Sequence, residues 1–153
     1  MKVLFVCTGN TCRSPMAEGY FSELCRKANR SDIEVASAGT YAVDGVPPSQ
    51  QSIAVLRDYG VDITHYTSSM LTREMLDNAA LIIVMTASHK QLICEAVPEA
   101  ADKIRLLLEF KEDNFSDVND PYGGSKSVYS YCFEEMKPAL DNLFAVIDSL
   151  INR

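Results

Sequence analysis

Two cysteines and one arginine lie close together near the N-terminus, in the run Cys7-Thr8-Gly9-Asn10-Thr11-Cys12-Arg13-Ser14-Pro15. The thiolate form of cysteine is a strong nucleophile, and a guanidinium group can hold a tetrahedral oxyanion through two parallel hydrogen bonds. Arg13 follows Cys7 by six positions, which is far enough for the intervening loop to curl and bring both side chains to one anion. The spacing predicts Cys7 as a nucleophile and Arg13 as the clamp on a bound phosphate.

The stretch between these residues has the composition of an anion-binding loop. Gly9 and Asn10 tolerate the positive φ angles of a tight turn, so that successive N–H groups can point at one centre. Pro15 suits the first position of a helix and Ser14 suits its N-cap, so the positive end of a helix dipole would face the same anion. We expect this field to make Cys7 more acidic than a free cysteine.

The elements that must position this loop are predicted from hydrophobic patterning. Short apolar runs alternate with segments of helical period, which indicates an α/β fold with right-handed crossovers and a parallel sheet. The predicted strands are Val3–Cys7, Ile33–Ala38, Leu81–Met85 and Ile104–Leu107. The predicted helices begin at Pro15, at Ser49, just after Thr72 and at Ser88, and a last helix covers Ser127–Leu150. Ligands of such sheets bind beyond the carboxyl ends of the strands, where the loop after the first strand lies.

Attack at phosphorus also requires an acid that protonates the leaving group. Asp120 is the candidate, because Pro121 fixes the direction of the polar loop 112–126, which is long enough to reach over the crevice. Attack by Cys7 would give a phosphocysteine that water then hydrolyses. The alternative is that Asp120 only forms a turn before proline, since two other aspartates lie in the same loop.

Composition limits the classes of function. The 153 residues, 47% of them hydrophobic, suffice for one domain, 1–153. The formal net charge of -7 and the scattered basic residues argue against a nucleic-acid partner. Apolar runs are too short to span a bilayer, and the N-terminal stretch lacks the features of a signal peptide, so we expect a cytoplasmic protein without a membrane partner. The five cysteines, an odd number, are typical of reduced thiols.

Cofactor and metal chemistry finds no support in the sequence. The lysine of the G-x-x-x-x-G-K-[ST] pattern is absent, and no G-x-G-x-x-G follows a predicted strand. There is no C-x2-C pair, and the two histidines, His65 and His89, lack partners at metal-ligand spacing. We predict neither a cofactor nor a metal.

The cysteine run, Ser37-Ala38-Gly39-Thr40 and Asp120-Pro121-Tyr122 together resemble the low-molecular-weight protein phosphatases, over essentially the whole chain. The resemblance implies a four-stranded parallel sheet in the order 2-1-3-4, with helices on both faces and a phosphate-binding loop after strand 1. It also implies a metal-independent, cofactor-free phosphatase, with a single phosphatase domain that acts on phosphorylated protein substrates. The sequence leaves the oligomeric state open, and a monomer is the expectation.

By that resemblance, Cys7 is the nucleophile, Arg13 the phosphate clamp and Asp120 the general acid. The phosphate-binding loop comprises Thr8, Gly9, Asn10, Thr11, Cys12, Arg13 and Ser14. Ser14 supplies a hydroxyl to the thiolate, Asn10 and Ser37 brace the loop, and Cys12 is the cysteine that pairs with Cys7 on oxidation. From the residues alone, Asn10 and Ser37 are equally interpretable as turn residues, and Cys12 as an inert neighbour.

Thr11 departs from the commoner tyrosine-phosphatase pattern, which has isoleucine there, and resembles the protein arginine phosphatases of Gram-positive bacteria. A hydroxyl at the pocket mouth can order a guanidinium or the attacking water, whereas isoleucine offers bulk suited to an aromatic ring. Tyr122 favours phosphotyrosine instead, because its ring could stack against the phenyl ring of such a substrate. We predict phosphoarginine as the favoured substrate and phosphotyrosine as the alternative.

Two other classes of function stay open. An arsenate reductase binds an oxyanion in a similar loop but passes electrons through additional cysteines, and only Cys94 lies in the region where they would be expected. A phosphate-binding module without chemistry would lack the nucleophile or the acid, whereas Cys7 and Asp120 are both present.

Overall fold

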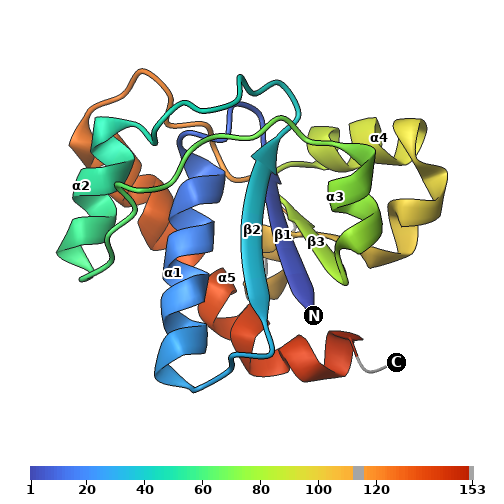
Figure 1. The fold of residues 1–153 in the computed structure, drawn as a ribbon. Helices are drawn as coiled ribbons and strands as arrows, with labels where there is room; N and C mark the ends of the chain where they lie inside the picture. Colours follow the sequence, from blue (N-terminus) through green and yellow to red (C-terminus); the bar gives the residue numbers. More distant parts are fainter. Residues whose placement is uncertain (112–115, 152–153) are drawn as a thin grey trace.

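The computed structural model describes residues 1–111 and 116–151 and contains a four-stranded sheet (Figure 1). The strands are β1 (Lys2–Cys7), β2 (Glu34–Gly39), β3 (Leu81–Val84) and β4 (Ile104–Leu106). All paired strands are parallel, and their order is β2-β1-β3-β4. The predicted fold class and strand order are confirmed. Reversal of the strand order beside β1 opens a crevice at the carboxyl end of the central strands.

Seven helical segments surround the sheet within the described residues. The α-helices are α1 (Arg13–Lys27), α2 (Gln50–Asp58), α3 (Arg73–Asn78), α4 (Ala87–Ala96) and α5 (Lys126–Ile151), and the 3₁₀ helices are η1 (Pro98–Lys103) and η2 (Leu107–Phe110).

The side chains of β1 alternate between two buried clusters, because successive residues of a strand point to opposite faces. Phe5 and Cys7 belong to the cluster formed with α1, α2 and α5, whereas Leu4 and Val6 belong to the cluster formed with α3 and α4. Figure 1 shows these helix groups on opposite sides of the sheet. Because both of their faces are covered, the two central strands, β1 and β3, are nearly continuous apolar runs.

The end of β1 is the point at which the site is built. Cys7 pairs in register with Gly39, the last residue of β2, so the two carboxyl ends lie side by side. The chain then turns through Thr8–Cys12 into α1, whose N-terminus faces the same crevice. The sheet thereby fixes the starting position of the loop.

Several predicted boundaries need correction. The first helix begins at Arg13 with Cys12 at its N-cap, so the prediction of Ser14 as the N-cap is wrong. Strand β4 ends at Leu106, and Leu107 opens η2. The last helix continues through Pro138 and exceeds its predicted ends by one residue on each side. Of the predicted loop 112–126, residues 112–115 lie outside the described part of the chain.

Within the described residues, no helix combines the length and the apolar character that crossing a lipid bilayer requires.

Candidate active site

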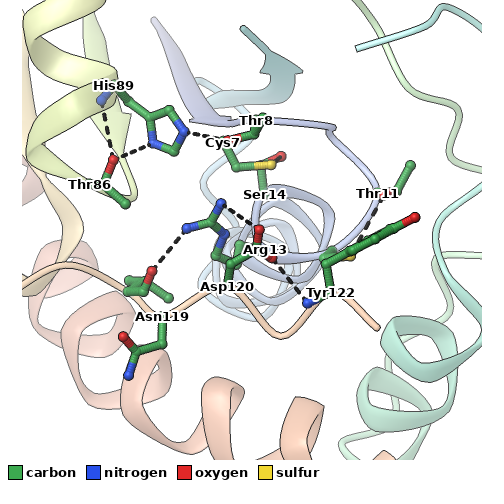
Figure 2. Close-up of polar contacts among 12 residues, drawn as sticks. Cys7, Thr8, Thr11, Arg13, Ser14, Thr86, His89, Asn119, Asp120 and Tyr122 are labelled. Atoms are coloured by element: carbon green, nitrogen blue, oxygen red, sulfur yellow. Dashed lines mark hydrogen bonds and ion pairs between the residues drawn. The ribbon is translucent and has the colours of Figure 1, made fainter. Parts of the chain in front are cut away.

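A cavity of about 250 Å³ opens at the carboxyl end of β1. Cys7 and Asp120, which are far apart in the sequence, both line its wall (Figure 2). The full lining consists of Cys7, Thr8, Gly9, Thr11, Cys12, Arg13, Asp120 and Tyr122. The structure therefore brings the predicted nucleophile, clamp and acid to one cavity.

Asn10 gives the loop its tight curvature. Its φ is 57°, a left-handed conformation that asparagine adopts more readily than most residues. In this conformation the Asn10 N–H donates to Cys7 Sγ over 3.3 Å. The backbone thus places a hydrogen-bond donor on the sulfur.

The Asn10 side chain sets the direction of a buried hydrogen-bond chain. Its Nδ2 group donates to Ser14 Oγ at 2.7 Å and to Ser37 Oγ at 2.8 Å. Because Ser14 Oγ accepts from Asn10, its own proton is available for Cys7 Sγ, which lies 2.8 Å away. Ser37 in turn donates to Glu18 Oε1 at 2.6 Å. Glu18 is a member of this network that the sequence analysis did not identify. Ser14 is therefore not the helix cap, and its hydroxyl makes the hydrogen bond to the sulfur that the family resemblance implies.

The end of β2 supports the same loop through its backbone. Thr40 N–H donates to the Cys7 carbonyl and Tyr41 N–H donates to the Thr8 carbonyl, each at 2.9 Å. A Cβ atom at Gly39 would collide with the Thr8 carbonyl oxygen, so this close approach requires glycine. The Ser37-Ala38-Gly39-Thr40 motif therefore has a direct physical role at the site.

Burial raises the pKa of the Cys7 thiol. Hydrogen bonds from Ser14 and Asn10 and the charge of Arg13 lower it, but desolvation has the larger influence. In the ligand-free chain, desolvation therefore opposes the acidification of Cys7 that the loop was expected to produce. The sequence does not reveal how completely packing removes this sulfur from water.

Arg13 is a buried cation whose hydrogen bonding is incomplete. Its side chain is 5% exposed, Nη1 donates to the Val118 carbonyl at 2.9 Å, and Nη2 lies 3.7 Å from Asp120 Oδ2. The Nε atom has no hydrogen-bond partner among residues 1–111 and 116–151. Because buried polar groups rarely remain unpaired, an anion in the cavity would supply the acceptor that this guanidinium lacks.

Asp120 and Tyr122 form the outer wall of the cavity. Asp120 Oδ1 accepts from the Tyr122 N–H at 3.1 Å, while half of the Asp120 side chain and 80% of Tyr122 remain exposed. The loop is held from below, because Val118 N–H donates to the Met85 carbonyl at 2.9 Å. Backbone hydrogen bonds of the loop thus position Asp120, and its carboxyl group stays accessible to solvent.

Residues 2–152 match the family model described as low molecular weight phosphotyrosine protein phosphatase. The chain belongs to this family. It is a cysteine-dependent phosphatase, and the loop after β1 is its phosphate-binding loop.

Named relatives of this phosphatase include enzymes of two specificities. It is 39% identical to a protein-arginine-phosphatase of Geobacillus stearothermophilus, over 93% of each chain. It superimposes with a TM-score of 0.87 on a low molecular weight protein tyrosine phosphatase of T. tengcongensis, at 44% identity over 95% of this chain and 98% of that one. It superimposes with a TM-score of 0.90 on the arginine phosphatase YwlE, solved as a C7S mutant with a phosphorylated active site serine, at 34% identity over 97% and 96% of the two chains.

The second loop cysteine of the phosphatase faces a tyrosine. Cys12 Sγ lies 3.1 Å from the hydroxyl of Tyr129 on α5 and 3.6 Å from Thr11 Oγ1. Cys7 and Cys12 both line the cavity, and both are free thiols. Cys12 is therefore more than a packing residue, since it has polar contacts on both sides.

His89 is a site neighbour for which the sequence analysis found no role. It is buried on α4, and its two ring nitrogens contact Thr8 and Thr86. Burial, followed by the charge of Arg13, lowers the pKa of His89 to about 4. Thr86 lies two residues after β3 and caps α4, so a capping threonine shortly after a buried strand was the sequence signal for the start of the helix that carries His89. Among the described residues, no cluster of His, Cys, Asp or Glu is arranged to hold a metal ion.

Proposed function

We propose that this enzyme removes phosphoryl groups from protein side chains through a phosphocysteine intermediate, and that phosphoarginine is its preferred substrate. The observation that carries the proposal is the cavity in which Cys7, Arg13, Asp120 and Thr11 meet. The first three supply attack, anion binding and proton transfer, and Thr11 adds a hydroxyl where the substrate side chain must pass.

In the first step, Cys7 Sγ attacks phosphorus. The S–P bond forms as the P–N bond of phosphoarginine breaks, and Asp120 gives its proton to the leaving nitrogen. A neutral thiol beside a phosphate dianion carries the same total charge as a thiolate beside a monoanion. The proton of Cys7 can therefore pass to a phosphoryl oxygen as substrate binds, which offsets the effect of burial on the sulfur.

Substrate binding also changes the partner of Arg13. In the ligand-free chain the guanidinium lies 3.7 Å from Asp120 Oδ2. A bound phosphoryl group would compete for the guanidinium through charge-assisted hydrogen bonds. Asp120, half exposed and released from this contact, is then free to act as the proton donor.

In the second step, water attacks the phosphocysteine. Asp120, now ionised, takes a proton from that water, the S–P bond breaks and inorganic phosphate leaves. Ser14 Oγ, 2.8 Å from Cys7 Sγ, donates to the sulfur as it departs as an anion. As inorganic phosphate leaves, the proton that the phosphoryl group took from Cys7 returns to the sulfur. The sum of the two steps is then hydrolysis, and the enzyme is back in its starting state.

The preference for phosphoarginine rests on Thr11. Its hydroxyl borders the cavity and can order a guanidinium or the attacking water, which isoleucine cannot do. The similarity to the Geobacillus stearothermophilus protein-arginine-phosphatase supports this assignment. Asp120 lines the same cavity, so the substrate N–H groups would meet a carboxylate acceptor as well as the Thr11 hydroxyl.

The test of specificity is kinetic. We expect a higher kcat/KM on a phosphoarginine peptide than on the matched phosphotyrosine peptide, and Thr11→Ile should move the ratio toward phosphotyrosine by about tenfold or more. The conservative variant Thr11→Ser keeps the hydroxyl and serves as the control. An unchanged ratio in Thr11→Ile would remove the role given to Thr11.

Phosphotyrosine is the second candidate substrate, and Tyr122 is the observation that favours it. Its ring is 80% exposed at the cavity wall and could stack on a substrate phenyl ring. The tyrosine phosphatase of T. tengcongensis, 44% identical, supports this alternative.

We also propose that Cys12 pairs with Cys7 on oxidation, since both line one cavity. Mass analysis after mild peroxide treatment, with Cys12→Ser as the control, tests this pairing. Arsenate reduction would require relay cysteines, and in the described part of the chain Cys25, Cys94 and Cys132 lie outside the cavity lining.

We infer a single-domain, monomeric, cytoplasmic enzyme that needs no cofactor and acts on phosphorylated proteins, without a nucleic-acid or membrane partner. The net charge of -7 supports the absence of nucleic-acid binding, and five free thiols support a reducing compartment. Sedimentation of the purified chain tests the monomer.

A further inference from the structure

A chain of three side chains leads from α4 to the wall of the active-site cavity (Figure 2). Thr8 Oγ1 lies 2.9 Å from His89 Nε2, and His89 Nδ1 lies 3.0 Å from Thr86 Oγ1. Thr8 is exposed and lines the cavity directly after Cys7, whereas His89 is buried behind it. The chain therefore has one end at the substrate and the other at a helix cap.

The cap determines the direction in which the hydrogen bonds run. Thr86 Oγ1 accepts the His89 backbone N–H at 3.2 Å, so its own proton is available to His89 Nδ1. His89 Nε2 then carries the ring proton and donates to Thr8 Oγ1. In the opposite arrangement Thr86 would accept two N–H groups, and its proton would have no acceptor assigned among the described residues.

The charge state of His89 favours this fixed direction. Burial and the nearby Arg13 lower its pKa to about 4, while the carboxylates of Asp117 and Asp120 oppose the shift. At neutral pH the ring is thus uncharged and carries one proton. A lone pair of Thr8 Oγ1 is occupied by that proton, which leaves the hydroxyl hydrogen free to donate.

We propose that the Thr8 hydroxyl donates a hydrogen bond to a phosphoryl oxygen of the substrate, and that His89 and Thr86 are positioning residues that hold it in the donor orientation. The proposal rests on the proposed function of Cys7, because the phosphoryl group must lie above that sulfur. Thr8 follows Cys7 directly and shares its cavity, so a phosphoryl oxygen is the acceptor that Thr8 would meet. A hydroxyl that stabilises transferring charge accelerates the reaction beyond binding alone.

The matched variants are Thr8→Val, which keeps the side-chain shape without the hydroxyl, and Thr8→Ser, which keeps the hydroxyl. Both are assayed with p-nitrophenyl phosphate and a phosphoarginine peptide, and inorganic phosphate serves as a competitive inhibitor. We expect Thr8→Val to lose about tenfold in kcat/KM with both substrates and to bind inorganic phosphate more weakly. Thr8→Ser should recover most of that loss.

The positioning role of His89 is tested by a double-mutant cycle. His89→Leu should lower kcat/KM by about as much as Thr8→Val, because both remove an oriented donor. The double variant should be no worse than Thr8→Val alone, since His89 acts through Thr8. His89→Gln, which has an N–H that can reach Thr8, should retain more activity than His89→Leu. Thermal unfolding of each variant shows whether the fold is intact.

Three results would overturn the proposal: full activity in Thr8→Val, additive losses in the double variant, or a loss confined to phosphoarginine. A loss confined to phosphoarginine would mean that the Thr8 hydroxyl contacts the leaving group and not a phosphoryl oxygen. A preference for phosphotyrosine would contradict the proposed specificity alone, because the p-nitrophenyl phosphate assay still measures the Thr8 contact. Activity that survives in Cys7→Ser would overturn the proposed function itself.

Discussion

The two walls of the active-site cavity are built in different ways. On the inner wall, Cys7 and Arg13 are almost fully buried, and Asn10 and Ser14 tie them into one hydrogen-bonded loop. On the outer wall, Asp120 is half exposed and close to the charge of Arg13. A phosphoryl group is the same in every substrate, so a rigid inner wall suits it, whereas the side chain that carries the group varies and meets the accessible wall.

The difference follows from how each wall is attached to the sheet. The inner wall continues β1, one of the two central strands, and enters α1 directly. The outer wall is joined by contacts between distant segments, such as the Ala87 N–H that donates to Asp117 Oδ1 at 2.8 Å. Substitutions on the inner wall should therefore affect every substrate, and those on the outer wall should depend on the leaving group.

The largest effect is expected for Cys7→Ser. A serine hydroxyl is a far weaker nucleophile here, so kcat on p-nitrophenyl phosphate should fall by about 10⁴-fold or more. Binding of inorganic phosphate, measured by calorimetry, should persist because the loop amides and Arg13 remain. Turnover close to that of the unmodified enzyme would show that the inner wall does not supply the nucleophile.

The next effect is expected on the outer wall. Asp120→Ala should reduce kcat on phosphoarginine by about 10²- to 10³-fold, because the leaving nitrogen needs a proton. The loss on p-nitrophenyl phosphate should be smaller, since its leaving group departs as a stable anion. Asp120→Asn, which keeps the side-chain shape but has no carboxyl proton to give, is the matched variant and should lose about as much as Asp120→Ala. Equal losses on both substrates would contradict the assignment of Asp120 as the acid.

A smaller change is expected for Ser14→Ala. Removal of the hydroxyl leaves desolvation less opposed, so the pKa of Cys7 should rise further. The value of kcat/KM at neutral pH should fall by about tenfold. The rate of alkylation by iodoacetamide across pH measures the pKa, and the Cys7→Ser chain supplies the background from other thiols. An alkylation profile that did not move would show that Ser14 has no influence on the sulfur.

The smallest effect concerns stability. The pKa of His89 is about 4, below its ordinary value of 6.5, so the unfolded chain binds more protons between these values. The stabilising contribution of neutral His89 is present above pH 6.5 and is lost as the pH falls toward 4. The Tm of the unmodified chain should decrease more steeply over this window than that of His89→Gln. Parallel pH profiles would show that His89 is accessible to protons in the folded state.

The sequence was most informative where chemistry is local in the chain. Cys7, Asn10 and Arg13 lie in one short loop, so their types and spacing predict an anion site before any packing is known. Asp120 was identified by its proline and its long loop, although two other aspartates competed with it. The alternation of apolar runs and helical segments predicted the parallel sheet, because buried strands leave a strong pattern.

The errors arose where a role depends on neighbours from elsewhere in the chain. Local composition placed Ser14 at the helix cap, but Cys12 holds that position, and the Ser14 hydroxyl reaches Cys7 because the loop curls back over the sulfur. His89 showed no partner in the sequence and has two in the structure, one of them on the phosphate-binding loop. Local patterns cannot report such contacts, since they form only when the strands are ordered.

The sequence by itself determined the class of fold and the loop after the first strand, and it predicted the nucleophile and its clamp. Only the tertiary structure decided the burial of Cys7, the proximity of Asp120 to Arg13, and the hydrogen-bonded connection from Thr86 through His89 to Thr8. The physical reason is that desolvation and long-range hydrogen bonds depend on the packing of segments distant in the chain, whereas loop curvature depends on adjacent residues.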